Sequence, residues 1–301
     1  MPAPFILHML TPLKQTSPFD VNMALDAGFD VVVPYNGVSK SEVRGLTQDA
    51  MFSRSPDNCP RTGLFFGGKN AIEALDMLEE ARGALFAPFE VSLFADPAGS
   101  FTTAAAMVAC VRKTFQEKFG RGLSGAHVVV FGATGVVGFS SAVIAALEGA
   151  HVVLAGHDGE ARVRHAAQEI EARFKVRVDA ADGSTDDRKS ALVQQADIVL
   201  AAGPAGRQVL AAAHLSGAEK LRVAADVNAV PPAGIEGVGV HDNGVEIAGT
   251  GAVGIGALAV GNVKYQTEQG LFRRMIEAGD AGKTVALDFR DAYDLAKSLA
   301  N

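Results

Sequence analysis

The sequence predicts an α/β fold of two domains, each built on a parallel β-sheet. Short apolar runs, rich in valine and other strand-forming residues, alternate with helix-length segments from one end of the chain to the other. At 301 residues the chain is long enough to bury two modest cores. A glycine-rich segment, GRGLSG at 120–125, separates two series of such strands.

The first series predicts strands over 5–10, 30–34, 63–67 and 89–96. Ser17 followed by Pro18 is typical of a helix N-cap with a first-turn proline. Ser39 and Glu42 have the spacing of a capping box. The apolar pattern of 102–119 predicts a long helix that leads out of the first domain.

The second series predicts five strands, each separated from the next by a helix-length segment: 127–133, 151–158, 175–182, 197–203 and 221–228. We therefore expect an N-terminal domain over 1–121 and a second domain over 122–280. The amphipathic segment 281–301 predicts a terminal helix that packs back on the first domain or bridges the two.

Composition and charge exclude several classes of protein. The net charge of −7 provides no basic patch for nucleic acid or for an anionic membrane surface. Cys59 and Cys110 lie far apart, and no metal-ligand spacing accompanies them, so we expect neither a disulfide framework nor a metal site. The opening MPAPFILHML is too short for a signal peptide, and no run of apolar residues suits a bilayer. We expect a cytoplasmic protein.

A glycine triplet predicts a cofactor site in the second domain. Gly132, Gly135 and Gly138 lie between a valine-rich strand and an apolar helix, where backbone N–H groups and a helix N-terminus suit a pyrophosphate. A purely structural turn is the alternative, but this context favours a Rossmann-type, doubly wound sheet that binds a dinucleotide. The expected cofactor contacts in the loop are Gly132, Ala133, Thr134, Gly135, Val136, Val137 and Gly138.

The end of the next strand indicates which dinucleotide is used. His157 and Asp158 lie there, and an acidic residue at this point binds the ribose 2′-hydroxyl of NAD. Asp158 also suits the alternative role of capping the helix that follows.

Two further loops follow strands of the same sheet, at 201–206 and 225–232. Because ligands bind outside the carboxyl ends of parallel strands, we expect both loops to face the nicotinamide half of the cofactor. The candidate contacts are Ala202, Gly203, Asp226 and Asn228. For Asp226 and Asn228, turn formation is an equal alternative.

Tyr293 and Lys297 have the Tyr-x-x-x-Lys spacing of short-chain dehydrogenases. In those enzymes the glycine loop lies near the start of the chain, whereas here it begins at Gly132. We interpret the pair as part of an ordinary amphipathic helix.

Several motifs resemble the NAD(P)-dependent methylene-tetrahydromethanopterin dehydrogenases of methylotrophic bacteria, and the resemblance spans essentially the whole chain. The motifs are HMLTPLKQTSPFDVNMALDAGFD, LTQDAMFSRSP, SLFADPAGSFTTAAAMVA, FGATGVVG, ADVNAVPPAGIEG and GIGALAVGNVKYQTE. The resemblance implies a substrate domain and a Rossmann domain with the active-site cleft between them. It also implies oxidation of the methylene form of a pterin one-carbon carrier to the methenyl form.

The resemblance also implies site residues in this chain. Phe19 matches a pterin-contacting phenylalanine, with a buried aromatic at a helix start as the alternative. Thr102 matches a substrate-contacting threonine beside Thr103, and it also suits helix capping. Lys264 lies where NADP-specific relatives carry a histidine, and with Thr102 it is the expected catalytic residue. Lys14 is the candidate for binding an acidic tail of the carrier.

The chain departs from its NADP-specific relatives after the second Rossmann strand. Where they have Gly-Arg-Lys, this sequence has Gly156, His157 and Asp158. We expect no cation to be placed for a 2′-phosphate, so that NAD is the main cofactor and NADP a second choice. The resemblance further implies a homo-oligomer, with a trimer as the candidate. Tyr35 and Lys40 are one residue too far apart for the cyclohydrolase motif of folate enzymes.

Two other functions stay open at this point. The first is the same reaction on methylene-tetrahydrofolate. The second is a non-catalytic module that senses a dinucleotide and binds a partner protein.

Overall fold

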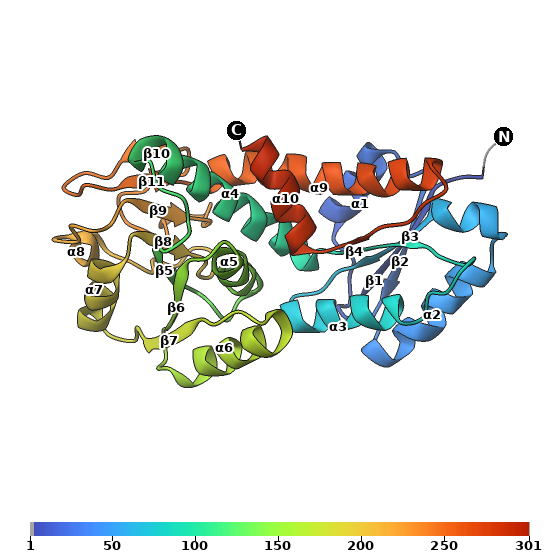
Figure 1. The fold of residues 1–301 in the computed structure, drawn as a ribbon, viewed down its shortest axis with the longest axis horizontal. Helices are drawn as coiled ribbons and strands as arrows, with labels where there is room; N and C mark the ends of the chain where they lie inside the picture. Colours follow the sequence, from blue (N-terminus) through green and yellow to red (C-terminus); the bar gives the residue numbers. More distant parts are fainter. Residues whose placement is uncertain (1–2, 301) are drawn as a thin grey trace. The chain divides into compact units, whose positions relative to one another are not determined.

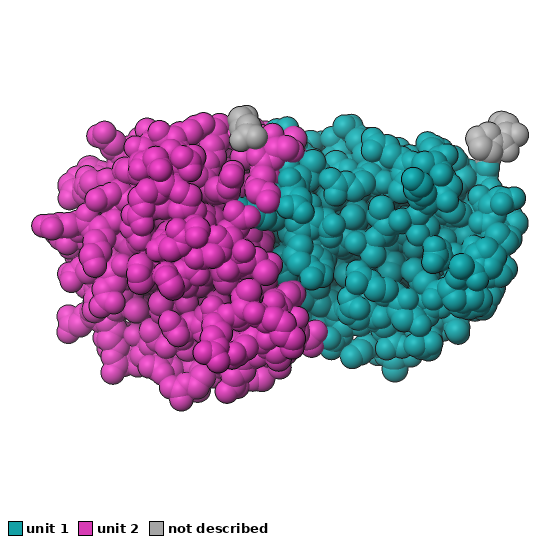
Figure 2. Space-filling model, in the orientation of Figure 1, with its two compact units in different colours: residues 1–102, 265–295 teal, residues 103–264, 296–301 magenta. Residues whose placement is uncertain are grey.

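The computed structural model describes residues 3–300, and the chain divides into two compact units. Unit 1 comprises Met1–Thr102 and Tyr265–Leu295, and unit 2 comprises Thr103–Lys264 and Ala296–Asn301 (Figure 2). The division falls inside three helices: α4 (Ser100–Phe119), α9 (Ala257–Asp280) and α10 (Phe289–Leu299). The boundaries expected from the sequence, after 121 and after 280, stay a prediction about where separately folding domains begin.

Unit 1 is built on a five-stranded, wholly parallel sheet with the order β12-β4-β3-β1-β2. Its strands are β1 (Ile6–Thr11), β2 (Val31–Asn36), β3 (Thr62–Phe66), β4 (Ser92–Ala95) and β12 (Ala286–Leu287). The four strands predicted from the first series are confirmed, although β4 is shorter than the predicted 89–96. The edge strand β12 comes from the C-terminal part of the chain and was not predicted.

The helices of unit 1 begin where the sequence signals place them. Apart from the three helices that the division crosses, they are α1 (Pro18–Ala27), α2 (Lys40–Phe52) and α3 (Ala71–Arg82). Two 3₁₀ turns, η1 (Pro56–Arg61) and η2 (Pro97–Gly99), complete the set. The Ser17 hydroxyl accepts the backbone N–H of Asp20, which confirms the predicted N-cap. The backbone N–H of Ser39 donates to the Glu42 carboxylate at 2.8 Å, which confirms the capping box.

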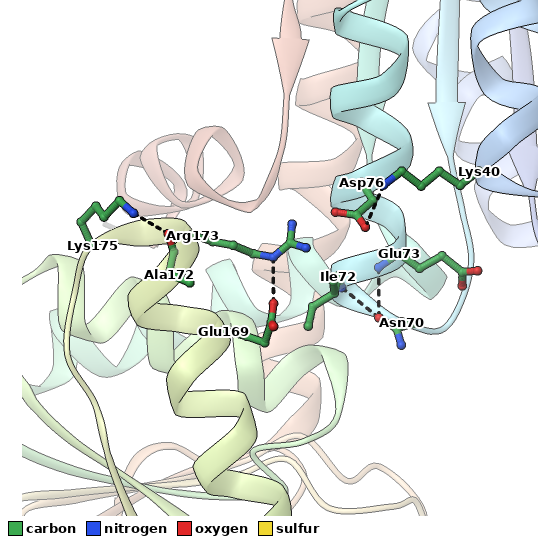
Figure 3. Close-up of polar contacts among 9 residues, drawn as sticks. All are labelled: Lys40, Asn70, Ile72, Glu73, Asp76, Glu169, Ala172, Arg173 and Lys175. Carbon is green, nitrogen blue, oxygen red and sulfur yellow. Dashed lines mark hydrogen bonds and ion pairs between the residues drawn. The ribbon is translucent and has the colours of Figure 1, made fainter.

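Polar contacts tie α3 to its neighbours in unit 1 (Figure 3). The Asn70 side chain accepts the backbone N–H groups of Ile72 and Glu73 at the start of α3. The ammonium of Lys40, at the start of α2, lies 3.3 Å from the Asp76 carboxylate of α3. The Asn70 cap fixes where α3 begins, whereas the exposed ion pair between α2 and α3 adds little to their packing.

An aromatic cluster forms the core of unit 1. Phe65 of β3, Phe94 of β4 and Phe272 of α9 are buried, with ring centroids 5.2–5.6 Å apart. Such edge-to-face contacts add to the free energy gained from burying the rings. The cluster holds the second half of α9 against the unit 1 sheet.

Unit 2 is built on a seven-stranded sheet with the order β10-β11-β9-β8-β5-β6-β7 (Figure 1). Its strands are β5 (His127–Phe131), β6 (His151–Gly156), β7 (Asp179–Asp182), β8 (Ile198–Ala201), β9 (Val223–Asp226), β10 (Asn243–Glu246) and β11 (Val253–Ile255). Its other helices are α5 (Val136–Leu147), α6 (Ala161–Phe174), α7 (Asp186–Gln195) and α8 (Ala212–Leu215). The doubly wound α/β class is confirmed. The antiparallel edge strand β10 was not predicted.

The two terminal helices differ in how well the sequence predicted them. Helix α10 confirms the amphipathic segment 281–301 over a shorter span, and residue 301 lies outside the described residues. Helix α9, with 24 residues, was not predicted. Within residues 3–300, no helix has both the length and the apolarity needed to cross a membrane.

Candidate functional site

The glycine loop joins β5 to α5, and two of its glycines are required by the space around them. Gly132 has φ of +78°, and a Cβ there would lie 2.3 Å from the carbonyl oxygen of Ala202. A Cβ on Gly138 would lie 2.4 Å from the carbonyl oxygen of Gly132. Helix and strand therefore pack closely at Gly138, and neither Gly132 nor Gly138 leaves room for a side chain.

The helix behind the loop supplies the electrostatic part of the site. Gly135 is the N-cap of α5, and Val136 and Val137 form its first turn. The backbone N–H groups of that turn and the positive end of the helix dipole suit an anion. Together with the bare loop, they fit the pyrophosphate of a dinucleotide.

The loops after β8 and β9 lie beside the glycine loop. The backbone N–H of Ala202 donates to the Phe131 carbonyl at 2.9 Å, and the N–H of Gly206 donates to the Asn228 side-chain oxygen at 3.1 Å. Strand β5 pairs with β6 on one side and with β8 on the other, so the strand order reverses at this point. Such a switch point is where open α/β sheets bind ligands.

Asp226 and Asn228 build the loop after β9. The Asp226 carboxylate is 3% exposed and accepts the backbone N–H groups of Asn228, Gly234 and Ile235. Burial raises the pKa of Asp226, and the three hydrogen bonds oppose that shift. The Asn228 amide also donates to the Pro232 carbonyl at 2.8 Å. These contacts account for both residues as turn formers, and contact with the cofactor stays a prediction.

At the end of β6 the structure places a guanidinium that the sequence motifs did not single out. The Asp158 carboxylate lies 3.2 Å from the Arg162 guanidinium, which also donates to the Thr134 hydroxyl of the glycine loop at 3.4 Å. A cation therefore lies beside this strand end, and the expectation that none is placed for a 2′-phosphate stays a prediction. The hydrogen bond from Arg162 is the largest cause that lowers the pKa of Asp158, so the carboxylate is ionised at neutral pH. His157 beside it is largely exposed.

Asp158 does not cap α6. The N-cap of that helix is Glu160, and the Asp158 side chain bonds the Arg162 side chain rather than a backbone N–H. The capping alternative is wrong, which leaves the Asp158 carboxylate at the strand end where a ribose hydroxyl is expected.

Unit 1 contains a pocket of about 430 Å³ at the carboxyl ends of its strands. Segments that follow β1 and β3 line it, and these strands are adjacent although β2 intervenes in the chain. The pocket therefore lies at the switch point of the unit 1 sheet. A mainly apolar lining with several polar groups suits a flat heterocycle with hydrogen-bonding edges.

Charged and apolar groups share the lining of this pocket. Lys14 and Lys69 contribute cations, and Asp20, 4% exposed, contributes a carboxylate. Met9 and Phe65 are apolar lining residues. Of the charged residues, sequence reasoning selected only Lys14. The signal for Lys69 was its position just after a buried strand.

Phe19 lies at the second position of α1 and is 46% exposed. The alternative of a buried aromatic at the helix start is therefore wrong. An exposed ring of this kind offers a flat apolar surface to a ligand.

The Asp96 carboxylate caps the start of α4, where it accepts the backbone N–H groups of Phe101 and Thr102, and the Thr102 side chain supports this cap. The Thr102 hydroxyl donates to the buried Asp96 carboxylate at 2.6 Å, and the backbone N–H of Phe101 donates to the other Asp96 oxygen at 2.8 Å. Thr102 is 0% exposed, whereas Thr103 is partly exposed. The geometry gives Thr102 a role in holding the capping carboxylate of Asp96, and a substrate contact from Thr102 stays a prediction.

The remaining candidates lie on the terminal helices. Lys264 is a partly exposed residue of α9. Tyr293 is buried in α10, and the ammonium of Lys297 lies 3.5 Å from the Glu148 carboxylate of α5's C-cap. These positions agree with a packing role for the Tyr-x-x-x-Lys pair. Within residues 3–300, no three His, Cys, Asp or Glu side chains are grouped to hold a metal ion.

Comparisons with known proteins agree with this geometry. A family model described as the N-terminal part of methylene-tetrahydromethanopterin dehydrogenase matches residues 18–98. The chain is 54% identical to the NAD(P)-dependent methylenetetrahydromethanopterin dehydrogenase of Methylorubrum extorquens, and the match covers 98% of each protein. This chain belongs to that family. The resemblance inferred from the sequence motifs is confirmed. A second relative from the same organism, the bifunctional protein MdtA, is 34% identical over 94% of this chain and 95% of its own length.

Two solved structures share the fold at low identity. Shikimate 5-dehydrogenase from Listeria monocytogenes, in complex with shikimate and NAD, has a TM-score of 0.52 and 14% identity, covering 93% of this chain and 95% of its own. The 5-ketofructose reductase of Gluconobacter sp. has a TM-score of 0.51 and 17% identity, covering 99% of each chain. These likenesses establish the α/β fold alone.

Proposed function

We propose that this protein oxidises methylene-tetrahydromethanopterin to methenyl-tetrahydromethanopterin by direct hydride transfer to NAD, with NADP as a second acceptor. The observation that carries the proposal is the 54% identity over 98% of the chain to a dehydrogenase of that name. The glycine loop and the strand-end Asp158 support the cofactor assignment, because both have the geometry that a dinucleotide needs.

The reaction depends mainly on how the protein positions the carrier against the nicotinamide. The hydride leaves a carbon flanked by two nitrogens, whose lone pairs stabilise the resulting cation. When bound, the nicotinamide supplies the hydride acceptor. The protein must hold the methylene carbon about 3–3.5 Å from that ring and exclude water. We assign no residue as a strong general base.

Unit 2 is proposed to hold the cofactor. The backbone from Gly132 to Gly138 and the first turn of α5 would bind the pyrophosphate. Asp158 would accept a ribose hydroxyl, since its lowered pKa keeps it ionised. Ala202 and Gly203 would adjoin the nicotinamide half.

Unit 1 is proposed to hold the carrier. The pocket at its switch point would take the pterin, with Lys14 and Lys69 available to acidic groups of the carrier. The exposed ring of Phe19 would stack on the pterin face. Thr102 would support the start of α4 through Asp96. Thr103 and Lys264, which belong to unit 2, are proposed as carrier contacts from the family resemblance alone.

The family resemblance also supports a cytoplasmic homo-oligomer, with a trimer as the candidate state. Light scattering of the purified protein at several concentrations tests this. A concentration-independent monomer mass would reject it.

The decisive assay mixes purified protein with methylene-tetrahydromethanopterin or methylene-tetrahydrofolate, each with NAD and with NADP. We expect NADH to form with the methanopterin carrier and much less product with the folate carrier. Comparable turnover on both carriers would favour the folate reaction as an equal function. Tight NAD binding without any change in nicotinamide absorbance would favour the non-catalytic sensing module.

A further inference from the structure

We propose that Asp158 and Arg162 form an exchangeable pair that lets one site accept two cofactors. Asp158 receives the ribose diol of NAD, and Arg162 receives the 2′-phosphate of NADP. This inference rests on the proposed cofactor site in unit 2, and it assigns to Arg162 a role in choosing the cofactor.

The position of the guanidinium carries the argument. Arg162 is the second residue of α6, directly after the loop that follows β6. One terminal nitrogen lies 3.2 Å from the Asp158 carboxylate, and the other lies 3.4 Å from the Thr134 hydroxyl. The side chain therefore spans from the strand end, where the adenosine ribose is expected, to the glycine loop, where the phosphates are expected.

The pair is exposed enough to exchange partners. The side chains of Arg162 and Asp158 are 58% and 45% exposed. An exposed ion pair of this kind contributes little to stability, so a phosphate can replace the carboxylate at small cost. Within the described residues, Asp158 and Thr134 are the only hydrogen-bond partners of the Arg162 guanidinium. Its five N–H donors thus leave a fork for the phosphate oxygens.

The charges explain why NAD would still be preferred. Asp158 is an anion beside the position of the 2′-substituent, and it repels a phosphate more than a hydroxyl. Arg162 offsets that repulsion without removing it. A site with Asp158 alone would reject NADP, and a site with Arg162 alone would favour it.

The test measures binding of cofactor fragments, which needs neither the carrier nor turnover. ADP-ribose and 2′-phospho-ADP-ribose are titrated calorimetrically into the full-length protein and its variants. In Arg162→Gln we expect affinity for the 2′-phosphorylated fragment to fall about tenfold or more, as for lost charged hydrogen bonds, with ADP-ribose changed less than about twofold. In Asp158→Asn we expect ADP-ribose to bind more weakly and the phosphorylated fragment more tightly.

Arg164→Gln is the matched control. Arg164 lies on the same helix and pairs with Glu160, so its removal changes the net charge equally without touching Asp158. If Arg164→Gln weakens the phosphorylated fragment as much as Arg162→Gln does, a general field effect replaces the specific contact and the proposal fails. Equal losses for both fragments in Arg162→Gln, or no loss, would also overturn it. If neither fragment binds the unaltered protein, the proposed cofactor site itself is wrong.

Discussion

The glycine loop of unit 2 and the pocket of unit 1 occupy equivalent places in two parallel sheets. Each lies where the strand order reverses, at β5 and β8 in one unit and at β1 and β3 in the other. The loop has no room for a side chain at Gly132, since a Cβ there would meet the Ala202 carbonyl. The pocket is open and is lined by side chains such as Lys14 and Lys69.

The glycine loop and the pocket show two ways in which the same strand topology can form a binding site. The backbone N–H groups of a helix N-terminus suit the phosphates that all nucleotides share, and the close approach of the phosphates requires glycines at fixed positions in the loop. Side chains can be exchanged to suit one carrier. A single atom added to the unit 2 loop should therefore have a large effect on stability and cofactor binding. A change of charge in the unit 1 pocket should have a smaller effect on carrier binding.

Gly132→Ala should have the largest effect. The new Cβ would clash with backbone and occupy a positive-φ conformation, so we expect a loss of about 3 kcal/mol or more in the free energy of unfolding. NADH binding should be lost as well. Urea denaturation and NADH fluorescence titration measure the two effects.

Gly125→Ala is the control for backbone strain alone. Gly125 has a similar φ of +74°, but a Cβ there would meet nothing within 4 Å. We expect a cost of about 1–2 kcal/mol and unchanged NADH affinity. Equal effects of the two substitutions would show that close approach at the loop is unimportant.

Thr102→Val should have the next largest effect. The change removes the hydroxyl that donates to the buried Asp96 carboxylate, so we expect about 2 kcal/mol of destabilisation in urea denaturation. Thr102→Ser keeps the hydroxyl and should restore most of that stability. If Thr102→Val left stability intact but raised the KM for the carrier, direct substrate contact would replace support of the Asp96 cap as its role.

Lys14→Gln and Lys69→Gln should act on the carrier alone. Each removes a cation from the unit 1 pocket, and we expect the KM for the carrier to rise about threefold to tenfold, more at low salt. NADH affinity should not change. Lys40→Gln, which removes an exposed lysine paired with Asp76, is the control. An equal rise in that variant would assign the effect to overall charge.

The smallest effect concerns His8 of β1, which lines a different cavity, beside Tyr35, and is not among the lining residues of the unit 1 pocket. Burial, with a contribution from Arg54, lowers the pKa of His8 below 6.5. The unfolded chain then binds the proton first, so stability is complete above about pH 6.5 and falls as the pH drops toward the folded-state pKa. His8→Gln should flatten that fall in urea titrations between about pH 7 and about pH 5. If the unfolding free energy of His8→Gln and of the unaltered protein fell equally with pH, the loss of stability could not be assigned to His8.

Local signals allowed much of the fold to be predicted. The N-cap at Ser17 and the capping box at Ser39 depend on side chains within three residues of one another, and both are present. The glycine loop was recognisable because its spacing serves local backbone geometry.

Features that depend on distant packing were missed. Helix α9 contains Gly270 and Gly279, which weaken the helical pattern in the sequence. A Cβ on Gly279 would lie 2.4 Å from the Pro60 carbonyl oxygen, so a tertiary contact with backbone requires that glycine, while one on Gly270 would lie 2.7 Å from the end of the Leu295 side chain. Strand β12 adds two residues to a sheet formed by the start of the chain, which no local pattern reveals.

Only part of the site could be predicted, because some of its contacts also depend on distant packing. Asp158 was selected by its place after a strand, but its partner Arg162 became apparent only once the first turn of α6 brought it beside Thr134. Lys69 lines the same pocket as Lys14 because β3 pairs with β1. Neither segment alone reveals that strand order.

The most direct test of the account follows the transferred hydrogen. The carrier is prepared with a dideuterated methylene group and incubated with the protein and NAD, and the nucleotide product is weighed by mass spectrometry. Direct transfer predicts one deuterium in each NADH formed, matched by one methenyl carrier. NADH without deuterium, or methenyl carrier formed without NADH, would contradict direct hydride transfer to the nicotinamide.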